Sequence, residues 1–252
     1  MDDRDGRHSI VVPLVRRGGR IGRMPRHGSL HLHEEVLLLA LRNDKGTVAG
    51  GVMYQQAAGG AILAELMLER RVRTVTDGRS TYAVVEDARP LGEPILDECL
   101  ARMAASKRRG KLATWVQRFS GTKQLKHRAA AGLADKGVLR EDEGRVLLLF
   151  TRRIYPERDP SFERRIVERL EEAVFRDAND IDARTTVLVA LAHHAGLLKA
   201  NLDRSRLKER RKRIDAIVKG DAIGRATKQV IDAVHAAVMV ATVIPAVTAV
   251  HH

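Results

Sequence analysis

Aromatic residues make up only 3% of this 252-residue chain, whereas hydrophobic residues of all kinds make up 44%. A core with so few rings must be built from Ala, Leu, Val and Ile, and such a core favours packed helices over a β-sandwich. Charged residues account for 31%, which is the balance of a globular protein. We therefore expect a mainly α fold: a single globular domain with a central helical bundle and short β-hairpins.

The formal net charge of +13 is the second constraint. A field of this strength attracts polyanions, which include nucleic acid, acidic lipid and acidic protein. A simple role in solubility is the alternative. Residues 1–28 are rich in Arg and Gly, and they show neither a helical nor a strand period. We expect a flexible basic arm over 1–28 and a folded domain over 29–252.

Apolar periodicity and turn residues predict the order of elements. The predicted helices cover residues 33–41, 57–68, 95–105, 112–119, 126–136, 161–175, 183–195, 204–218 and 226–244. The predicted hairpins have strands at 72–75 and 82–85 around Asp77-Gly78, and a turn at Glu143-Gly144 before a strand at 146–150. A helix followed by a hairpin thus occurs twice. The apolar stretch 233–250 contains His235 and Pro245, and we interpret it as a buried helix and not a membrane span.

Residues with catalytic or metal-binding potential do not converge in this sequence. The run from His31 to Glu35 lacks the HExxH spacing of a zinc protease. The single cysteine, Cys99, excludes an internal disulfide and lies in an apolar helical stretch, so we interpret it as an inert thiol of a cytoplasmic protein. We expect no enzyme activity, no catalytic residues, no metal and no cofactor.

Basic residues gather in three clusters, and the second has the most specific geometry. The clusters are 107–111, the group Lys123, Lys126, His127 and Arg128, and 208–213. Lys123 and Lys126 are three residues apart at the start of a predicted helix, where backbone N–H groups already favour an anion. The second cluster therefore predicts a phosphate site formed by Lys123, Lys126 and Arg128. An ordinary exposed basic turn is the alternative.

Several stretches together resemble the Golgi phosphoprotein 3 family, including its bacterial and especially actinobacterial members. These stretches are HEEVLLLALRNDKGTV (33–48), GAILAELMLERRV (60–72), LGEPILDECLARM (91–103), LADKGVLREDEGRVLLLF (133–150), the Tyr155-Pro156 that follows and LVALAHHAGLL (188–198). The resemblance implies a mainly helical domain with a four-helix core. It also implies peripheral membrane binding through the headgroup phosphate of phosphatidylinositol 4-phosphate.

The resemblance assigns the phosphate pocket of eukaryotic members to one tryptophan and three arginines. Two of the arginines fall on Lys123 and Lys126, so both positions stay cationic. The third falls on Gly59, and the tryptophan has no counterpart in 47–54. Two lysines can hold a phosphate without distinguishing among phosphates, because Lys is a point charge and Arg a bidentate fork.

The family hairpin implicated in membrane contact and self-association matches residues 146–156. It places Leu149, Phe150, Arg152 and Arg153 at the membrane, where apolar and cationic side chains suit acidic lipid. A packed strand with a solvated tip is the alternative.

Together these features predict a peripheral membrane protein that binds phosphatidylinositol 4-phosphate or another acidic headgroup. We expect it to be cytoplasmic at the inner face of the membrane, to act as an adaptor for a protein partner and to form homo-oligomers. The alternative is a winged-helix-like nucleic-acid-binding protein, because a helix and hairpin occur twice. The sequence disfavours nucleic acid, since the presumed recognition helices are apolar over 61–68 and 129–134.

Overall fold

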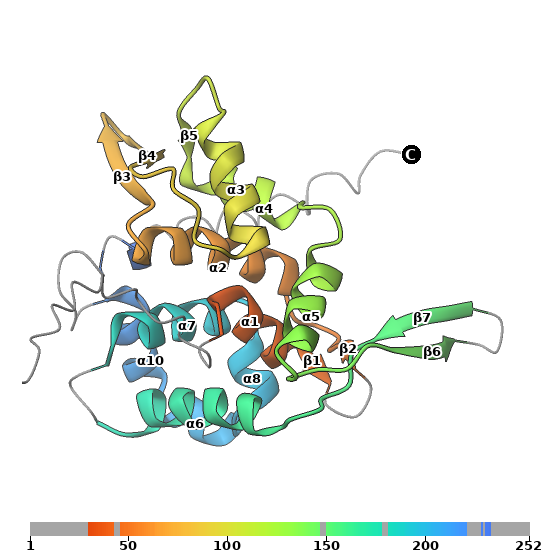
Figure 1. The fold of residues 1–252 in the computed structure, drawn as a ribbon. Helices are drawn as coiled ribbons and strands as arrows, with labels where there is room; N and C mark the ends of the chain where they lie inside the picture. The colour runs from red at the N-terminus through yellow and green to blue at the C-terminus, as the bar shows by residue number, and fades with distance from the viewer. Residues whose placement is uncertain are drawn as a thin grey trace, which may run out of the picture.

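Helices form most of the protein, as the scarcity of aromatic residues predicts (Figure 1). The computed structural model describes residues 30–42, 46–146, 150–177, 181–220, 228 and 230–232. The helices are α1 (Leu32–Ala40), α2 (Tyr54–Leu68), α3 (Pro94–Ala104), α4 (Leu112–Ser120), α5 (Leu125–Asp135), α6 (Ser161–Phe175), α7 (Ala183–His194), α8 (Leu197–Asn201), α9 (Arg204–Glu209) and α10 (Arg211–Lys219). The strands are β1 (Leu41–Arg42), β2 (Thr47–Val48), β3 (Val72–Asp77), β4 (Ser80–Val85), β5 (Gly110–Lys111), β6 (Asp142–Val146) and β7 (Phe150–Ile154).

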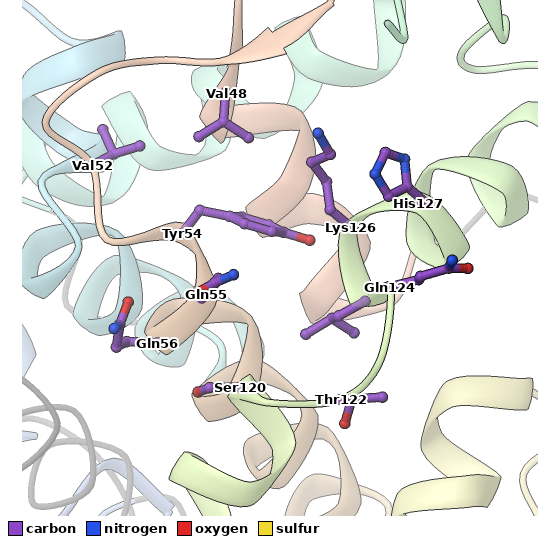
Figure 2. A pocket seen from close by; sticks show the side chains of 11 residues that line it. Val48, Val52, Tyr54, Gln55, Gln56, Ser120, Thr122, Gln124, Lys126 and His127 are labelled. Carbon is purple, nitrogen blue, oxygen red and sulfur yellow. The ribbon is translucent and has the colours of Figure 1, made fainter. Parts of the chain in front are cut away.

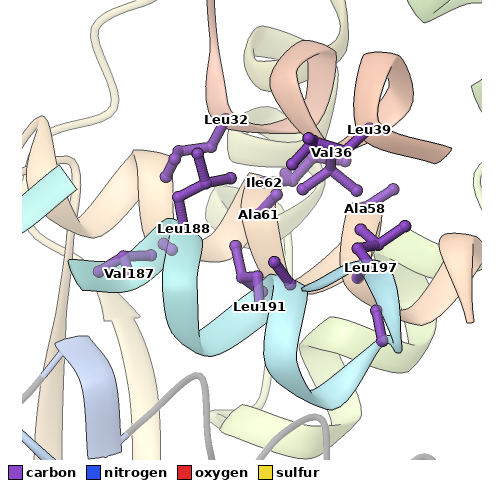
Figure 3. Packing of buried hydrophobic residues seen from close by; sticks show 14 of the residues in the cluster. Leu32, Val36, Leu39, Ala58, Ala61, Ile62, Val187, Leu188, Leu191 and Leu197 are labelled. Carbon is purple, nitrogen blue, oxygen red and sulfur yellow. The ribbon is translucent and has the colours of Figure 1, made fainter. Parts of the chain in front are cut away.

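Helix α2 lies at the centre of the core, with α1, α4 and α7 packed around it (Figure 1). Figure 3 shows Leu32 and Val36 of α1 meeting Ile62 of α2 and Leu188 of α7, and all four side chains are buried. Burying one such side chain contributes about 1.5–3 kcal/mol. The core is therefore built from aliphatic side chains on facing helices.

The small residues of α2 let its neighbours approach closely. A Cβ added at Gly59 would lie 2.3 Å from Ser120 Oγ and 2.5 Å from the carbonyl oxygen of Val116, both on α4. No side chain fits at this position without moving the α4 backbone. Gly59 therefore fixes the distance between two core helices.

The strands in the described part of the chain form three separate antiparallel sheets. One pairs β1 with β2, the second has the order β3-β4-β5, and the third pairs β6 with β7. The turn between β3 and β4 contains Gly78 at φ +58°, a left-handed conformation that glycine adopts without strain. The β6–β7 hairpin projects from the helical body in Figure 1.

The predicted elements are largely confirmed, with differences at boundaries and in the second hairpin. Glu143 and Gly144 lie inside β6, so the predicted turn there and the continuous strand over 146–150 are wrong. Val146 of β6 pairs with Phe150 of β7, and this register gives each strand five paired residues; residues 147–149 lie outside the described residues. The predicted helix over 204–218 is two helices that meet at Arg210. The arm over 1–28 and all but four residues of the predicted helix over 226–244 lie outside the described residues.

Among the residues described, no helix combines the length and apolarity needed to cross a membrane. The apolar stretch 233–250 itself lies outside them.

Candidate functional site

A pocket of about 510 Å³ opens between the start of α2 and the start of α5 (Figure 2). Its walls come from β2, the segment that leads into α2, the first turn of α2, the end of α4 and the beginning of α5. The lining residues are Val48, Val52, Tyr54, Gln55, Gln56, Ser120, Thr122, Gln124, Leu125, Lys126 and His127. No carboxylate occurs among them, so the pocket combines one cation with neutral polar groups.

Lys126 supplies the positive charge of the pocket from the first turn of α5. It is half-buried, and its side chain lies at the pocket in Figure 2. Gln124, the N-cap residue, has a φ of 54°, and its side chain makes no capping hydrogen bond. The helix therefore begins beside the pocket with the positive end of its dipole unmasked by a side-chain cap, which favours an anion.

Neither Lys123 nor Arg128 lines the pocket as Lys126 does. Lys123 is exposed in the turn before α5, so the spacing argument for one helical face does not apply to it. It lies close in sequence to the pocket mouth but is not among the lining residues. Arg128 donates from Nη1 to Glu98 Oε2 of α3 at 2.5 Å, outside the pocket lining. The structure thus brings only Lys126 of the three predicted cations into the pocket wall.

His127 and Tyr155 form a fixed pair at the edge of the pocket. His127 Nδ1 lies 2.7 Å from the Tyr155 hydroxyl. Partial burial, and then the charge of Lys126, lower the pKa of His127 below its ordinary value. The imidazole is therefore neutral at pH 7 and adds hydrogen-bonding capacity but no charge.

Residues 47–54, to which the family resemblance assigns the missing tryptophan, do line the pocket. They contribute Val48, Val52 and Tyr54. Gly59, matched to the third arginine, faces α4 instead, where its backbone contact leaves no room for a longer side chain. Tyr54 was not predicted to line the pocket, although it is an aromatic residue inside the region of the absent tryptophan.

The predicted membrane-contact residues lie on the projecting hairpin or in its connection. Leu149 lies outside the described residues, and Phe150 and Arg152 pair through their backbones with Val146 and Gly144. The Arg153 side chain is 63% exposed, and its Nε lies 3.3 Å from Glu141 Oε1. Arg153 also hydrogen-bonds the side chain of Tyr155, the partner of His127, so the base of the hairpin lies beside the edge of the pocket.

The other two basic clusters contain cations that hold the fold together. Arg109 pairs with Asp77 at 3.0 Å and covers the ring of Tyr82. Arg210 pairs with Asp177 at 2.8 Å, and Arg213 Nε donates to the Ala173 carbonyl at 2.8 Å. These contacts connect β3 to the loop before β5, and α10 to α6.

Each of the three buried glutamates of α1 and α2 forms an ion pair with a basic side chain. Glu34 binds Lys136, Glu35 binds Arg169, and Glu65 binds Arg184. Across the described chain, no group of His, Cys, Asp and Glu is arranged to hold a metal ion. Burial raises the pKa of Cys99 to about 11, so its thiol is un-ionised at neutral pH.

The fold and the pocket define a class: a mainly helical domain with short hairpins and a cationic pocket suited to an anionic group. A family model described as Golgi phosphoprotein 3 (GPP34) matches residues 32–234. That match covers more than half of the chain, and the chain belongs to the Golgi phosphoprotein 3 family. The resemblance of the sequence motifs is thereby confirmed.

Two fungal proteins are similar to this chain. The vacuolar protein sorting-associated protein 74 of Eremothecium gossypii is 29% identical over 208 residues, which cover 69% of this chain and 62% of that protein. The protein of the same description from Schizosaccharomyces pombe is 27% identical over 226 residues, which cover 75% of this chain and 66% of that protein. The matches therefore span less than two thirds of either relative's length.

Proposed function

We propose that this protein docks on acidic membranes by holding a headgroup phosphate in the pocket between α2 and α5. The observation that carries the proposal is the position of Lys126, on the first turn of α5 and among the residues that line the pocket. An ammonium group and a helix N-terminus both stabilise an anion at this place. Phosphatidylinositol 4-phosphate is the headgroup that the family resemblance favours, and other acidic lipids share its phosphate chemistry.

Lys123 is the second proposed phosphate ligand. Its ammonium group extends from an exposed turn beside the pocket mouth, where it can follow a bound headgroup. Each basic residue near an anionic surface contributes about 1 kcal/mol. The net charge of +13 adds long-range attraction to the same surface. Arg128 contributes to phosphate binding only when its ion pair with Glu98 is broken.

The β6–β7 hairpin is the proposed second contact with the membrane and with another copy of the chain. It projects from the helical body (Figure 1), and its Arg153 side chain is largely exposed. The proposed contact residues are Leu149, Phe150, Arg152 and Arg153. A hairpin of this kind adds apolar and cationic contacts beyond the phosphate pocket.

An adaptor role, without catalysis, agrees with the names of the family and its relatives. Those names refer to the Golgi and to vacuolar protein sorting. We propose that the protein works at the cytoplasmic, inner face of a membrane and recruits a protein partner there. The nucleic-acid alternative requires α2 or α5 to enter a groove. The central position of α2 argues against it, because a recognition helix must present polar side chains outward.

Liposome co-sedimentation at near-physiological salt tests the proposal. Vesicles of phosphatidylcholine alone are compared with vesicles that also contain phosphatidylserine or phosphatidylinositol 4-phosphate at matched surface charge. Lys123→Ala plus Lys126→Ala is expected to abolish most binding to both acidic vesicles. Lys208→Ala plus Lys212→Ala removes the same charge from exposed positions on α9 and α10 and is the matched control. Equal losses in the two variants would reduce the site to diffuse attraction, and no binding by the wild type would refute membrane docking.

A further inference from the structure

Strand β3 is the outer strand of the β3-β4-β5 sheet, and no strand in the described part of the chain pairs with its other side. Figure 1 shows β3 at the outside of this sheet, while α3 and α4 pack against β4 and β5. Its sequence, VRTVTD, has four β-branched residues and no proline. The backbone N–H and C=O groups along such an edge are a template for a further strand.

The hydrogen bonds to β4 determine which residues of β3 face the open side. The carbonyl oxygen of Arg71, directly before β3, accepts a hydrogen bond from the Glu86 N–H at 2.8 Å. Backbone groups of an antiparallel strand point to alternate sides, so the odd-numbered residues of β3 bond to β4. Thr74 and Thr76 therefore point their backbone N–H and C=O groups to the open side, where a further strand would bond them.

A second copy of β3 matches this edge best in one antiparallel register. Each twofold register that joins the outward groups of the two copies is centred on a single residue of β3. Only the register centred on Val75 places Arg73 opposite Asp77 of the second copy, and the symmetry makes this pair occur twice. The same register sets Thr74 opposite Thr76. Opposite charges, β-branched pairs and Thr–Thr pairs all stabilise strands that lie side by side.

The two charged residues are accessible for this pairing. Arg73 is exposed, and its side chain has no ion pair or hydrogen bond with any described residue. The Asp77 side chain is 60% exposed, and its Oδ2 accepts a hydrogen bond from Arg109 at 3.0 Å. A carboxylate accepts more than one guanidinium group, so Asp77 can hold Arg109 and also Arg73 of a second copy.

We propose that β3 pairs with β3 of a second copy of this chain, antiparallel and centred on Val75, so that two three-stranded sheets join into one of six strands. No residue of β3 lines the headgroup pocket or belongs to the β6–β7 hairpin, and the inference depends on neither. The contact is short compared with a standard protein interface, so we expect a reversible dimer.

Exchange of the two charges tests the register, because it predicts both a loss and a rescue. Self-association of the full chain is measured by sedimentation equilibrium between about 1 μM and about 1 mM protein. Arg73→Asp is expected to weaken it about thirtyfold, since two attractive pairs become repulsive, and Asp77→Arg is expected to do the same. The double variant restores opposite charges and is expected to recover most of the association. Arg79→Asp, exposed in the adjoining turn, is the matched control.

A cysteine at the centre of the register provides a test that does not depend on charge. The two copies of Val75 form a non-hydrogen-bonded pair across the axis, with Cα atoms about 4.5 Å apart, which suits a disulfide. Mild oxidation is therefore expected to cross-link Val75→Cys into a dimer. Thr76→Cys lies opposite Thr74 and is expected to stay uncross-linked. The native Cys99 is buried and does not compete.

The outcomes distinguish this interface from other forms of self-association. A wild type that stays monomeric, or an Arg73→Asp variant that associates as well as Arg79→Asp, overturns the inference. A double variant no better than the single ones overturns the register, and equal cross-linking of Val75→Cys and Thr76→Cys does so too. Circular dichroism checks that each variant is folded. Failure of the wild type to bind acidic vesicles overturns the proposed function alone.

Discussion

Two polar regions of the helical body differ in the surroundings of their charged side chains. Around α1, each buried glutamate has a cation: Glu34 lies 2.6 Å from Lys136, Glu35 2.9 Å from Arg169, and Glu65 2.7 Å from Arg184. In the pocket between α2 and α5, Lys126 lines a wall without a described carboxylate, and the Tyr54 hydroxyl has no described partner. Internal pairing uses charges for folding, whereas the pocket wall places one cation beside neutral polar and apolar side chains.

The largest expected effect comes from breaking the paired region at Arg184. This side chain donates to Glu65 Oε1 and to the Leu30 carbonyl oxygen, and it lies 3.8 Å from Glu35 Oε2. Arg184→Ala leaves two nearly buried carboxylates without this partner, and we expect a loss of about 3–5 kcal/mol in the free energy of unfolding. Urea denaturation measures it.

Arg176→Ala is the control for that experiment, because its pair with Glu172 is exposed on both sides. Its expected cost is below about 0.5 kcal/mol. Equal costs for the two variants would show that burial does not distinguish these pairs. Acidic-vesicle binding by the folded Arg184→Ala protein is expected to match the wild type.

Acid is expected to weaken the paired region through Glu65. Burial alone would raise the pKa of Glu65, but its contacts with His31, Arg184 and the Leu32 backbone N–H outweigh burial and lower the pKa to about 2. A depressed carboxyl pKa stabilises the fold above the unfolded value near 4.5, and this contribution is lost as the pH falls through 2. The loss amounts to about 3 kcal/mol. Unfolding free energies of the wild type and Glu65→Gln between pH 6 and acid measure it; a variant with the same acid sensitivity would contradict the assignment.

Removing Lys123 and Lys126 together is expected to affect binding and not stability. Lys123→Ala plus Lys126→Ala should weaken binding to acidic vesicles by about thirtyfold, which corresponds to ~2 kcal/mol for two cations near a charged surface. The unfolding free energy should change by less than about 0.5 kcal/mol, as for ordinary surface substitutions. A large loss of stability would mean that these lysines belong with the paired charges.

Tyr54→Phe is expected to stabilise the protein. Removing an unpaired buried hydroxyl relieves a desolvation cost, and we expect a gain of about 1 kcal/mol in the free energy of unfolding. Differential scanning calorimetry without ligand measures it against Tyr82→Phe. A loss of stability instead would mean that the hydroxyl has a structural partner, and Tyr54 would then resemble the glutamates of α1.

The sequence predicted most helices because their apolar spacing is local. Ser161–Phe175 was predicted to the residue, since its apolar positions repeat at helical spacing and Pro160 precedes it. The hairpin of β6 and β7 was shifted because Glu143-Gly144 imitates a turn locally, while the register depends on cross-strand partners such as Asp142 and Ile154. Local patterns do not contain that pairing.

The pocket was harder to predict, because its walls come from distant segments. Lys126 was found as a cation at a helix start, which is a local signal. Tyr54 lies 72 positions earlier in the chain, and only the folded structure shows that no described group reaches its hydroxyl. The partners of the α1 glutamates are equally distant, with Glu34 and Lys136 separated by 102 positions. The sequence alone shows neither the ion pairs of the glutamates nor the lack of a described partner for the Tyr54 hydroxyl.

Arg128 provides the finest test of the contrast between the two regions. Its sequence neighbours place it with the pocket cations, but its guanidinium group contacts Glu98 of α3 at 2.5 Å. Both side chains are about one third exposed, so solvent screens the pair and its contribution is at most about 1 kcal/mol. We expect Arg128→Ala to lower stability by roughly that amount and vesicle binding by less than Lys126→Ala does. Glu98→Gln is the complementary variant, because it releases the guanidinium group. If Glu98→Gln increases binding to acidic vesicles and the increase disappears with Arg128→Ala, then Glu98 competes with phosphate for this arginine, and the pairing of Arg128 sets how many cations the pocket offers.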